Sequence, residues 1–338
     1  MLKRTVDTGL SERKNNFDFL RFLAATLVIF SHSWPLTQGT NSHEPLEVLT
    51  GKQLDFGALA VYIFFIISGF LIAMSFDRTQ SLGRFAKARF LRIAPALVMV
   101  VVFLAAIVGP IDTTLTQSAY WSSFPFLGFV ADHLPGVFVH NPYSGAVDGS
   151  LWTIKFEVLC YALVALMGVL KLLTNRWVLA VFLLCSMTPW AGEYSAGLLP
   201  YFAVGMFFYG FRRVVPIRGT FAIAAALVLV AAFVTHHVGL VLPFSLAYLV
   251  LWFAFTPSIP LQNFARYGDW SYGLYIWAFP VQQQWMQAFP ELSPITLFLL
   301  SLPTTWVLSV LSWNLIEKRA LALKGKILLS GGHSSRVA

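Results

Sequence analysis

The sequence predicts an all-α polytopic membrane protein, a bundle of about ten transmembrane helices. Its 338 residues are 57% hydrophobic and only 11% charged, whereas a soluble domain usually has about 25% charged residues. The mean hydropathy of +0.71 points the same way. The apolar runs are long and continuous, which favours helices over the short alternating strands of a membrane β-barrel. We therefore expect the lipid bilayer to be a partner of most of the chain.

The apolar runs predict the individual spans and the domain limits. Residues 1–16 form a cytoplasmic N-terminal segment, 17–320 the transmembrane domain, and 321–338 a disordered cytoplasmic tail. Several spans are short or contain Pro or Gly, which is tolerated where neighbouring helices satisfy the freed backbone groups. The spans are predicted at 17–34, 55–75, 93–110, 149–170, 177–191, 197–211, 219–236, 240–257, 271–289 and 294–313.

The distribution of lysine and arginine predicts the orientation of the chain. With both termini in the cytoplasm, all of the 23 basic residues except Lys52 and Lys155 lie on the cytoplasmic side, as the positive-inside rule requires. The net charge of +8 is thus explained without nucleic acid as a partner. Cys160 and Cys185 lie in apolar runs without a metal-ligand spacing, so we expect neither a disulfide nor a metal site. The first run follows polar residues and lacks a cleavage site, which predicts a retained helix.

Three ionisable residues interrupt the first span, FDFLRFLAATLVIFSHSWPL. Asp18, Arg21 and His32 share one helix face, and Arg21 and His32 lie about 16 Å apart along the axis. Charged groups deep in a bilayer are costly and usually functional. His32 has the chemistry of a general base. Alternatively, Arg21 reaches water at the inner interface and His32 does so at the outer one.

The fourth span begins GSLWTIKFEVLCYALVAL and places Glu157 well below the membrane surface. Tyr161 follows one turn later on the same face. A buried carboxylate needs a partner, and Lys155 faces away from it on the same helix. His32 or Arg21 on another helix would serve. The alternative is an interhelical salt bridge without a catalytic role.

Other spans carry candidate binding residues. In VYIFFIISGFLIAMSF, Ser68 and Gly69 either permit close helix packing or leave room for a ligand chain. In RFAKARFLRIAP, Arg89 and Arg92 lie one turn apart and either hold phosphate groups or anchor the cytoplasmic side. In the ninth span, aromatic residues form a packing belt or line a sugar site: Tyr272, Tyr275 and Trp277.

Taken together, these segments resemble the integral-membrane acyltransferase-three family of bacterial sugar O-acyltransferases, from about residue 15 to 320. Arg21 and His32 are similar to the family's Arg-x10-His pattern. Ala278 departs from the pattern, because the family often has histidine there. Without an esterase-like extension, the chain resembles the stand-alone branch. The other similar segments are FFIISGFLI, RFLRIAP, SLWTIKFEVLCY with Trp152, WSYGLYIWAFPV and NLIEKRAL.

The resemblance implies transfer of an acyl group, most often acetyl, from cytoplasmic acyl-CoA to a hydroxyl of a cell-surface or exopolysaccharide sugar in the bacterial inner membrane. No tightly bound cofactor is expected, because acetyl-CoA is a substrate. Arg89, Arg92 and Arg21 would hold the nucleotide phosphates. His32 would deprotonate the acceptor or carry the acyl group, and Glu157 would orient it. The rival interpretation is a transporter or flippase of a lipid-linked sugar, since intramembrane charges and broken helices also suit that class.

Overall fold

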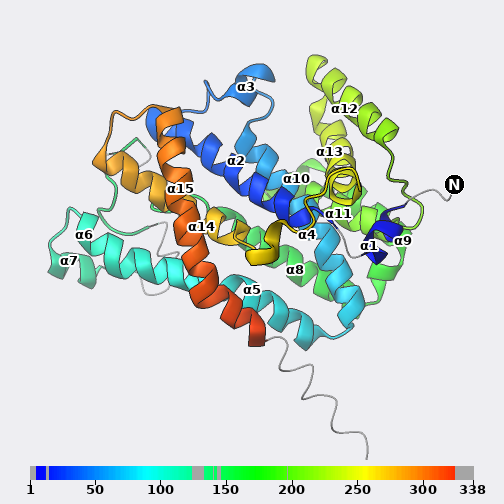
Figure 1. Ribbon diagram of the computed structural model, residues 1–338, viewed down its shortest axis with the longest axis horizontal. Helices are drawn as coiled ribbons and strands as arrows, with labels where there is room; N and C mark the ends of the chain where they lie inside the picture. Colours follow the sequence, from blue (N-terminus) through cyan, green and yellow to red (C-terminus); the bar gives the residue numbers. More distant parts are fainter. Residues whose placement is uncertain are drawn as a thin grey trace, which may run out of the picture. The chain divides into compact units, whose positions relative to one another are not determined.

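The computed structural model describes residues 5–12, 15–123, 133–139, 141–142, 146–195 and 197–323 (Figure 1). It is 76% helical, and the only β pairing in the described part is an isolated bridge between Thr5 and Pro216. The predicted all-α class is confirmed. The chain forms two compact units. Unit 1 comprises residues 1–31, 41–82 and 153–267, and unit 2 comprises 32–40, 83–152 and 268–338.

Six helical segments in the described part are long and apolar enough to cross a membrane: Phe17–Gln38, Phe56–Thr79, Leu82–Asp112, Trp152–Val169, Val238–Phe255 and Pro294–Leu323. Three further apolar helices are shorter, and Ser271–Ala288 (α14) contains three consecutive glutamines that lower its hydropathy. The count of ten spans and the cytoplasmic position of the termini therefore stay predictions. The predicted disordered tail lies almost entirely outside the described residues.

One predicted loop is helical. The predicted spans 55–75 and 93–110 leave residues 76–92 between them as a cytoplasmic loop, but α4 (Phe56–Thr79) and α5 (Leu82–Phe103) leave only a two-residue break. Gln80 adopts a left-handed conformation with φ of 48°, which ends α4. Phe85 and Ala88 bury one face of the first turns of α5 while Lys87 is exposed. The basic residues that follow Leu82 therefore lie on an amphipathic helix rather than in a loop.

The core of unit 1 is built on the contact between α4 and α11 (Leu199–Gly210). A Cβ on Gly69 would lie 2.0 Å from the carbonyl oxygen of Phe202, and one on Gly205 would lie 2.2 Å from that of Ile66. Only glycine allows the two backbones to approach this closely. Helix packing thus accounts for the glycine at position 69.

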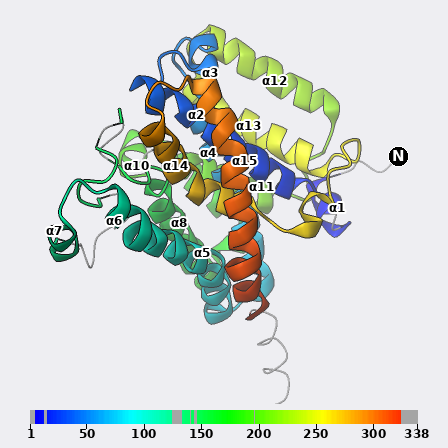
Figure 2. The ribbon, with the colours of Figure 1, turned by 60° about the vertical axis from the view of Figure 1, so that its left-hand side comes forward.

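The rest of unit 1 surrounds this pair. α13 (Val238–Phe255) packs against both α4 and α11, and α12 (Gly219–Val234) packs along α13 (Figure 2). Phe17 at the start of α2 (Phe17–Gln38) contacts the rings of Phe70 and Phe255, at 5.9 and 5.3 Å between centroids. The unit also contains α1 (Val6–Ser11), α3 (Pro45–Leu49), α8 (Trp152–Val169, from Thr153), α9 (Arg176–Ser186) and α10 (Pro189–Tyr194).

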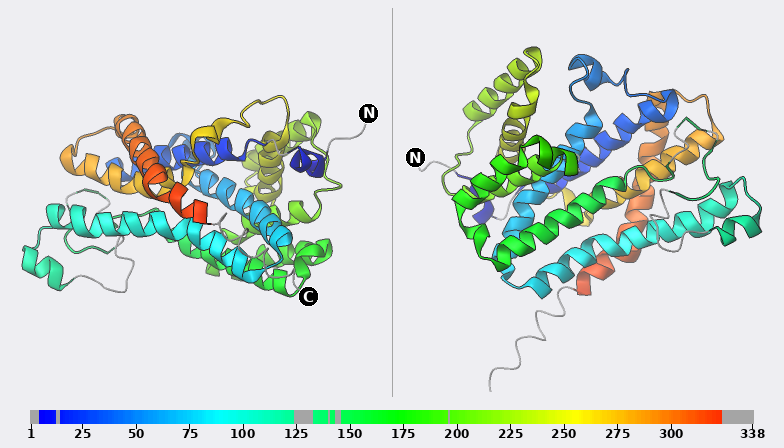
Figure 3. Two further views of the ribbon diagram at one scale, coloured as in Figure 1. Left: turned by 60° about the horizontal axis from the view of Figure 1, so that its bottom comes forward. Right: turned by 180° about the vertical axis from the view of Figure 1, so that it is seen from behind.

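The centre of unit 2 is α14, which has 13 buried residues out of 18. α15 (Pro294–Ser312) packs against it (Figure 3). The buried face of α15 carries the small side chains of Ser301, Thr305 and Ser309, and Ser309 lies against Gly273 of α14. Small residues bring these two helices close together, as is common between membrane helices.

The remaining helices of unit 2 extend α5. A π-helical turn at Leu104–Val108 joins α5 to α6 (Gly109–Asp112), so that the three form one continuous rod (Figure 3). The hydroxyl of Tyr120 on α7 (Gln117–Ser122) donates a hydrogen bond of 2.8 Å to the carbonyl of Ala105 in that turn. A π-turn shifts the helical hydrogen-bond pattern. The hydrogen bond from Tyr120 to the carbonyl of Ala105 holds α7 against this turn.

Candidate active site

His32 lies at the start of unit 2, where α2 leaves unit 1 after Ser31. Its ring is half-buried and packs edge-to-face on Phe279 of α14, with 5.3 Å between ring centroids. Pro35 lies inside the same helix and cannot donate to the carbonyl four residues earlier, that of Ser31. The proline therefore loosens the helical bonding next to the predicted base, while Phe279 holds its ring.

Polar and apolar contacts hold the His32 segment against α14. The side-chain amide of Gln282 donates a hydrogen bond of 3.0 Å to the hydroxyl of Ser33, and both residues are fully buried. Leu36 packs into a buried cluster with Phe279, Met286 and Leu297. Because Ser33 is adjacent to His32, the Gln282 contact fixes the position from which the imidazole projects.

The segment before α8 lies against the same part of α14. A Cβ on Gly149 would lie 2.7 Å from the ring of Phe279, so Gly149 and His32 both contact this ring. Tyr275 donates a hydrogen bond of 2.9 Å to the carbonyl of Ser150. Gln283 donates one of 2.7 Å to the carbonyl of Ala146. α14 thus gathers His32, Tyr275 and the segment leading to Trp152, whose side chain is 41% exposed.

Arg92 occupies a second polar cluster of unit 2. Its guanidinium lies 2.6 Å from Asp269 and 3.7 Å from the buried carboxylate of Glu317. Ser271 donates a hydrogen bond to Asp269, and Ser312 donates one to Glu317. Arg92 therefore links α5 to the segments at the start of α14 and the end of α15.

Tyr272 and Arg89 lie near Arg92 in unit 2. Tyr272 lies beneath its guanidinium, 5.7 Å from ring centroid to Cζ, and donates a hydrogen bond of 3.0 Å to the carbonyl of Ile93. Arg89 lies one turn earlier, half-buried, with its guanidinium 6.0 Å from the ring of Phe85. Of the three arginines predicted to hold phosphate, Arg92 thus contacts two carboxylates.

The other predicted site residues lie in unit 1. Arg21 forms an ion pair with Asp18 one turn away on α2. The hydroxyl of Tyr161 donates a hydrogen bond to Glu157, so the tyrosine one turn further along α8 is a partner of this carboxylate. The hydroxyl oxygen of Ser68 is buried and has no hydrogen-bond partner among the described residues. Glu157 belongs to unit 1 and His32 to unit 2, so their predicted pairing stays a prediction.

Sequence reasoning missed several residues of these clusters. Asp269 is separated from Arg92 by 177 positions, and no local spacing connects the two. The same is true of Gln282 and Ser33, which are 249 positions apart. The available signal was composition, because buried amides such as Gln282 and Gln283 in an apolar helix require partners.

Comparison with known proteins places this chain in a family. The family model described as an acyltransferase domain matches residues 14–314. An O-acetyl transferase of Shigella phage Sf6 is 30% identical over 335 residues, covering 91% of this chain and 96% of the relative. Nodulation protein 10 of Rhizobium leguminosarum bv. viciae is 28% identical over 362 residues, covering 94% and 96%. No solved structure matches the chain.

The match covers both units and includes every predicted site residue, from Arg21 to Tyr275. With its long apolar helices, the protein is a multi-pass membrane protein. The chain belongs to acyltransferase family 3 and is an acyltransferase.

Proposed function

We propose that the protein is an O-acetyltransferase that moves an acetyl group from acetyl-CoA to a hydroxyl of a cell-surface or exopolysaccharide sugar. The similarity to the O-acetyl transferase of phage Sf6 supports the acetyl group and the ester product. The observation that carries the proposal is the placement of His32. It lies on an apolar helix, half-buried against Phe279, in a chain that belongs to an acyltransferase family.

His32 acts as the general base of the proposed reaction. Its imidazole removes the proton of the sugar hydroxyl as the oxygen attacks the thioester carbonyl of acetyl-CoA. The new C–O bond forms, the C–S bond breaks, and the imidazolium returns the proton to the leaving CoA thiolate. A histidine suits both steps, because its unperturbed pKa lies near neutrality. Phe279 and the Gln282–Ser33 hydrogen bond limit the orientations of the ring.

Arginine side chains hold the donor phosphates in this proposal. Arg89 and Arg92 share this task, and Arg92 also contacts Asp269 and Glu317. Arg21 contributes less, since its guanidinium is paired with Asp18. Ser68 offers a buried hydroxyl to the donor, next to Gly69. Guanidinium groups suit this task because they bind phosphate oxygens in bidentate geometry.

Aromatic side chains of unit 2 bind the acceptor sugar in this proposal. Trp152 presents a partly exposed indole directly after the segment that lies on Phe279. Tyr275 is held by the carbonyl of Ser150 in the same region. The reaction takes place in the bacterial inner membrane with cytoplasmic acetyl-CoA, and acetyl-CoA enters as a substrate rather than as a tightly bound cofactor.

The test compares the O-acetyl content of surface glycans from a strain lacking the protein with strains restored by wild type, His32→Ala or His43→Ala. His43 is an exposed histidine of the loop after α2 and serves as the matched control. We expect wild type and His43→Ala to restore the ester signal, and His32→Ala to accumulate in the membrane without restoring it.

An ester signal restored by His32→Ala contradicts the assigned base. If glycan export fails while acetylation per exported glycan is unchanged, the surface glycan is not the acceptor and the proposal is contradicted. A purified preparation provides the independent check, because release of CoA from acetyl-CoA must depend on added sugar acceptor.

A further inference from the structure

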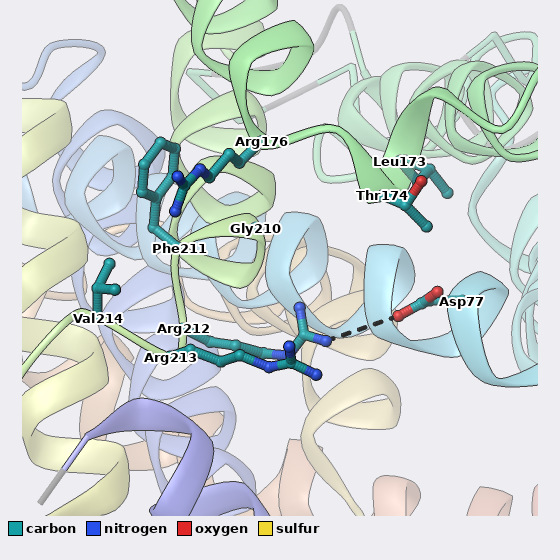
Figure 4. A pocket seen from close by; sticks show the side chains of 9 residues that line it. All are labelled: Asp77, Leu173, Thr174, Arg176, Gly210, Phe211, Arg212, Arg213 and Val214. Carbon is teal, nitrogen blue, oxygen red and sulfur yellow. Dashed lines mark ion pairs between the residues drawn. The ribbon is translucent and has the colours of Figure 1, made fainter.

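A basic cavity lies in unit 1, apart from the residues assigned to acyl transfer. It has a volume of about 420 Å³ and is formed where α4 ends, α9 begins and α11 ends (Figure 4). Three arginines and a single aspartate line it, together with small and apolar groups. The lining residues that the argument uses are Asp77, Arg176, Phe211, Arg212, Arg213 and Val214.

Arg212 forms an ion pair with Asp77, and the remaining arginines give the cavity a positive charge. Arg212 lies 3.8 Å from Asp77 and 3.3 Å from Asp7 of α1. Asp77 also accepts a hydrogen bond of 2.6 Å from the hydroxyl of Tyr209. The two carboxylates offset two of the three arginine charges, which leaves one positive charge to attract an anion.

Arg213 and Arg176 are the arginines available to a ligand. Arg213 is exposed and forms no ion pair with a described residue. Figure 4 shows its side chain extending beside that of Arg212 in the same direction, toward Asp77. Two adjacent guanidinium groups repel each other unless an anion lies between or beside them. Arg176 is exposed and contacts the ring of Phe211, 5.7 Å from Cζ to centroid.

The surface beside the cavity is apolar and aromatic. Trp177 is 65% exposed and Val214 is 60% exposed. The indole of Trp177 packs edge-to-face on Phe211, 6.0 Å between centroids, and Arg176 lies 5.5 Å from the same indole. Exposed tryptophan next to arginine is typical of the level of lipid head groups, where the ring meets acyl chains and the cation meets phosphate. Basic pockets between membrane helices bind anionic head groups in this way.

We propose that this cavity binds the phosphate of an anionic phospholipid, with Arg213 and Arg176 as its ligands and Trp177 and Val214 against the acyl chains. Phosphate is the shared chemistry of two sources, a membrane lipid and a soluble nucleotide. The exposed apolar surface beside the arginines favours the lipid. The proposal does not depend on acyl transfer, because none of these residues belongs to the proposed active site.

The test titrates the full-length protein, purified in a neutral detergent, with phosphatidylglycerol and counts bound lipid by native mass spectrometry. Phosphatidylcholine, coenzyme A and inorganic phosphate are titrated in parallel. We expect phosphatidylglycerol to bind more tightly than phosphatidylcholine. Arg213→Gln and Arg176→Gln should each weaken phosphatidylglycerol binding about fivefold, because an arginine near an anionic lipid contributes about 1 kcal/mol.

Arg266→Gln is the matched control, since Arg266 is an exposed arginine of unit 1 outside the cavity. It should bind phosphatidylglycerol as the wild type does. Unchanged binding by Arg213→Gln and Arg176→Gln overturns the proposal, and so does an equal loss in Arg266→Gln. Arginine-dependent binding of coenzyme A or inorganic phosphate without that of phosphatidylglycerol assigns the cavity to a soluble ligand and also overturns it. Arg213 and Arg176 are both exposed. The thermal unfolding of the Arg213→Gln and Arg176→Gln proteins without lipid should therefore match that of the wild type.

Discussion

Replacing Arg92 by glutamine should destabilise unit 2 rather than only weaken donor binding. The guanidinium holds Asp269 at 2.6 Å and Glu317 at 3.7 Å, and the carboxylate of Glu317 is only 3% exposed. Removing one partner of a buried ion pair costs about 3–5 kcal/mol, because the remaining charge is left uncompensated. The Arg92 side chain is 18% exposed, so we expect the lower limit, about 3 kcal/mol. A loss of that size lowers Tm by about 4 °C in a chain of 338 residues.

The assay is thermal unfolding of the purified protein in detergent, with Glu317→Gln as the second variant. The double variant Arg92→Gln/Glu317→Gln should be more stable than Arg92→Gln alone, since the amide removes the unpaired buried charge. A wild-type Tm in Arg92→Gln, combined with a raised KM for acetyl-CoA, would refute this reasoning. Arg92 would then be a donor-binding residue that the two carboxylates only orient.

Three further predictions concern packing, positioning and pH. Gly69→Ala should cost about 3 kcal/mol of stability, measured by thermal unfolding, because its Cβ would lie 2.0 Å from the Phe202 carbonyl; an unchanged Tm would mean that the two helices separate freely. Gln282→Leu should lower kcat about tenfold or more by releasing the segment of His32, with KM for acetyl-CoA unchanged; a change in KM alone contradicts this positioning role. Burial raises the pKa of Glu44 in the loop before α4, so its contribution to stability is greatest below the unfolded pKa and declines as pH rises through the folded pKa. Glu44→Gln should therefore flatten the decline of Tm as the pH rises above 4.5, the ordinary pKa of this group, and an identical decline in both proteins would show that another group causes it.

Hydropathy and periodicity in the sequence were enough to determine the class of protein and most of its helices. Long apolar runs predict membrane helices because each run must satisfy its own backbone hydrogen bonds in lipid. The same local reasoning failed for residues 76–92. There the predicted spans left a loop between them, but Phe85 and Ala88 recur at helical spacing and bury one face of α5.

The six segments that resemble the family, among them those around Arg21, His32 and Glu157, were together sufficient to predict an acyltransferase of this family, because each is a short local pattern. The hydrogen-bond and ion-pair partners of the site residues could be predicted only where they are close in sequence. Tyr161 could be expected beside Glu157 from its position one helical turn away, whereas Asp269 and Gln282 could not be expected beside Arg92 and Ser33.

Tertiary structure alone decided which side chains meet across the chain. It placed Asp269 and Glu317 on Arg92, although 177 positions separate Arg92 from Asp269. It also buried the glutamines of α14, because the hydroxyl of Ser33 and the carbonyl of Ala146 compensate their desolvation. Helix propensity and hydropathy are properties of neighbouring residues, whereas these contacts depend on how distant helices pack.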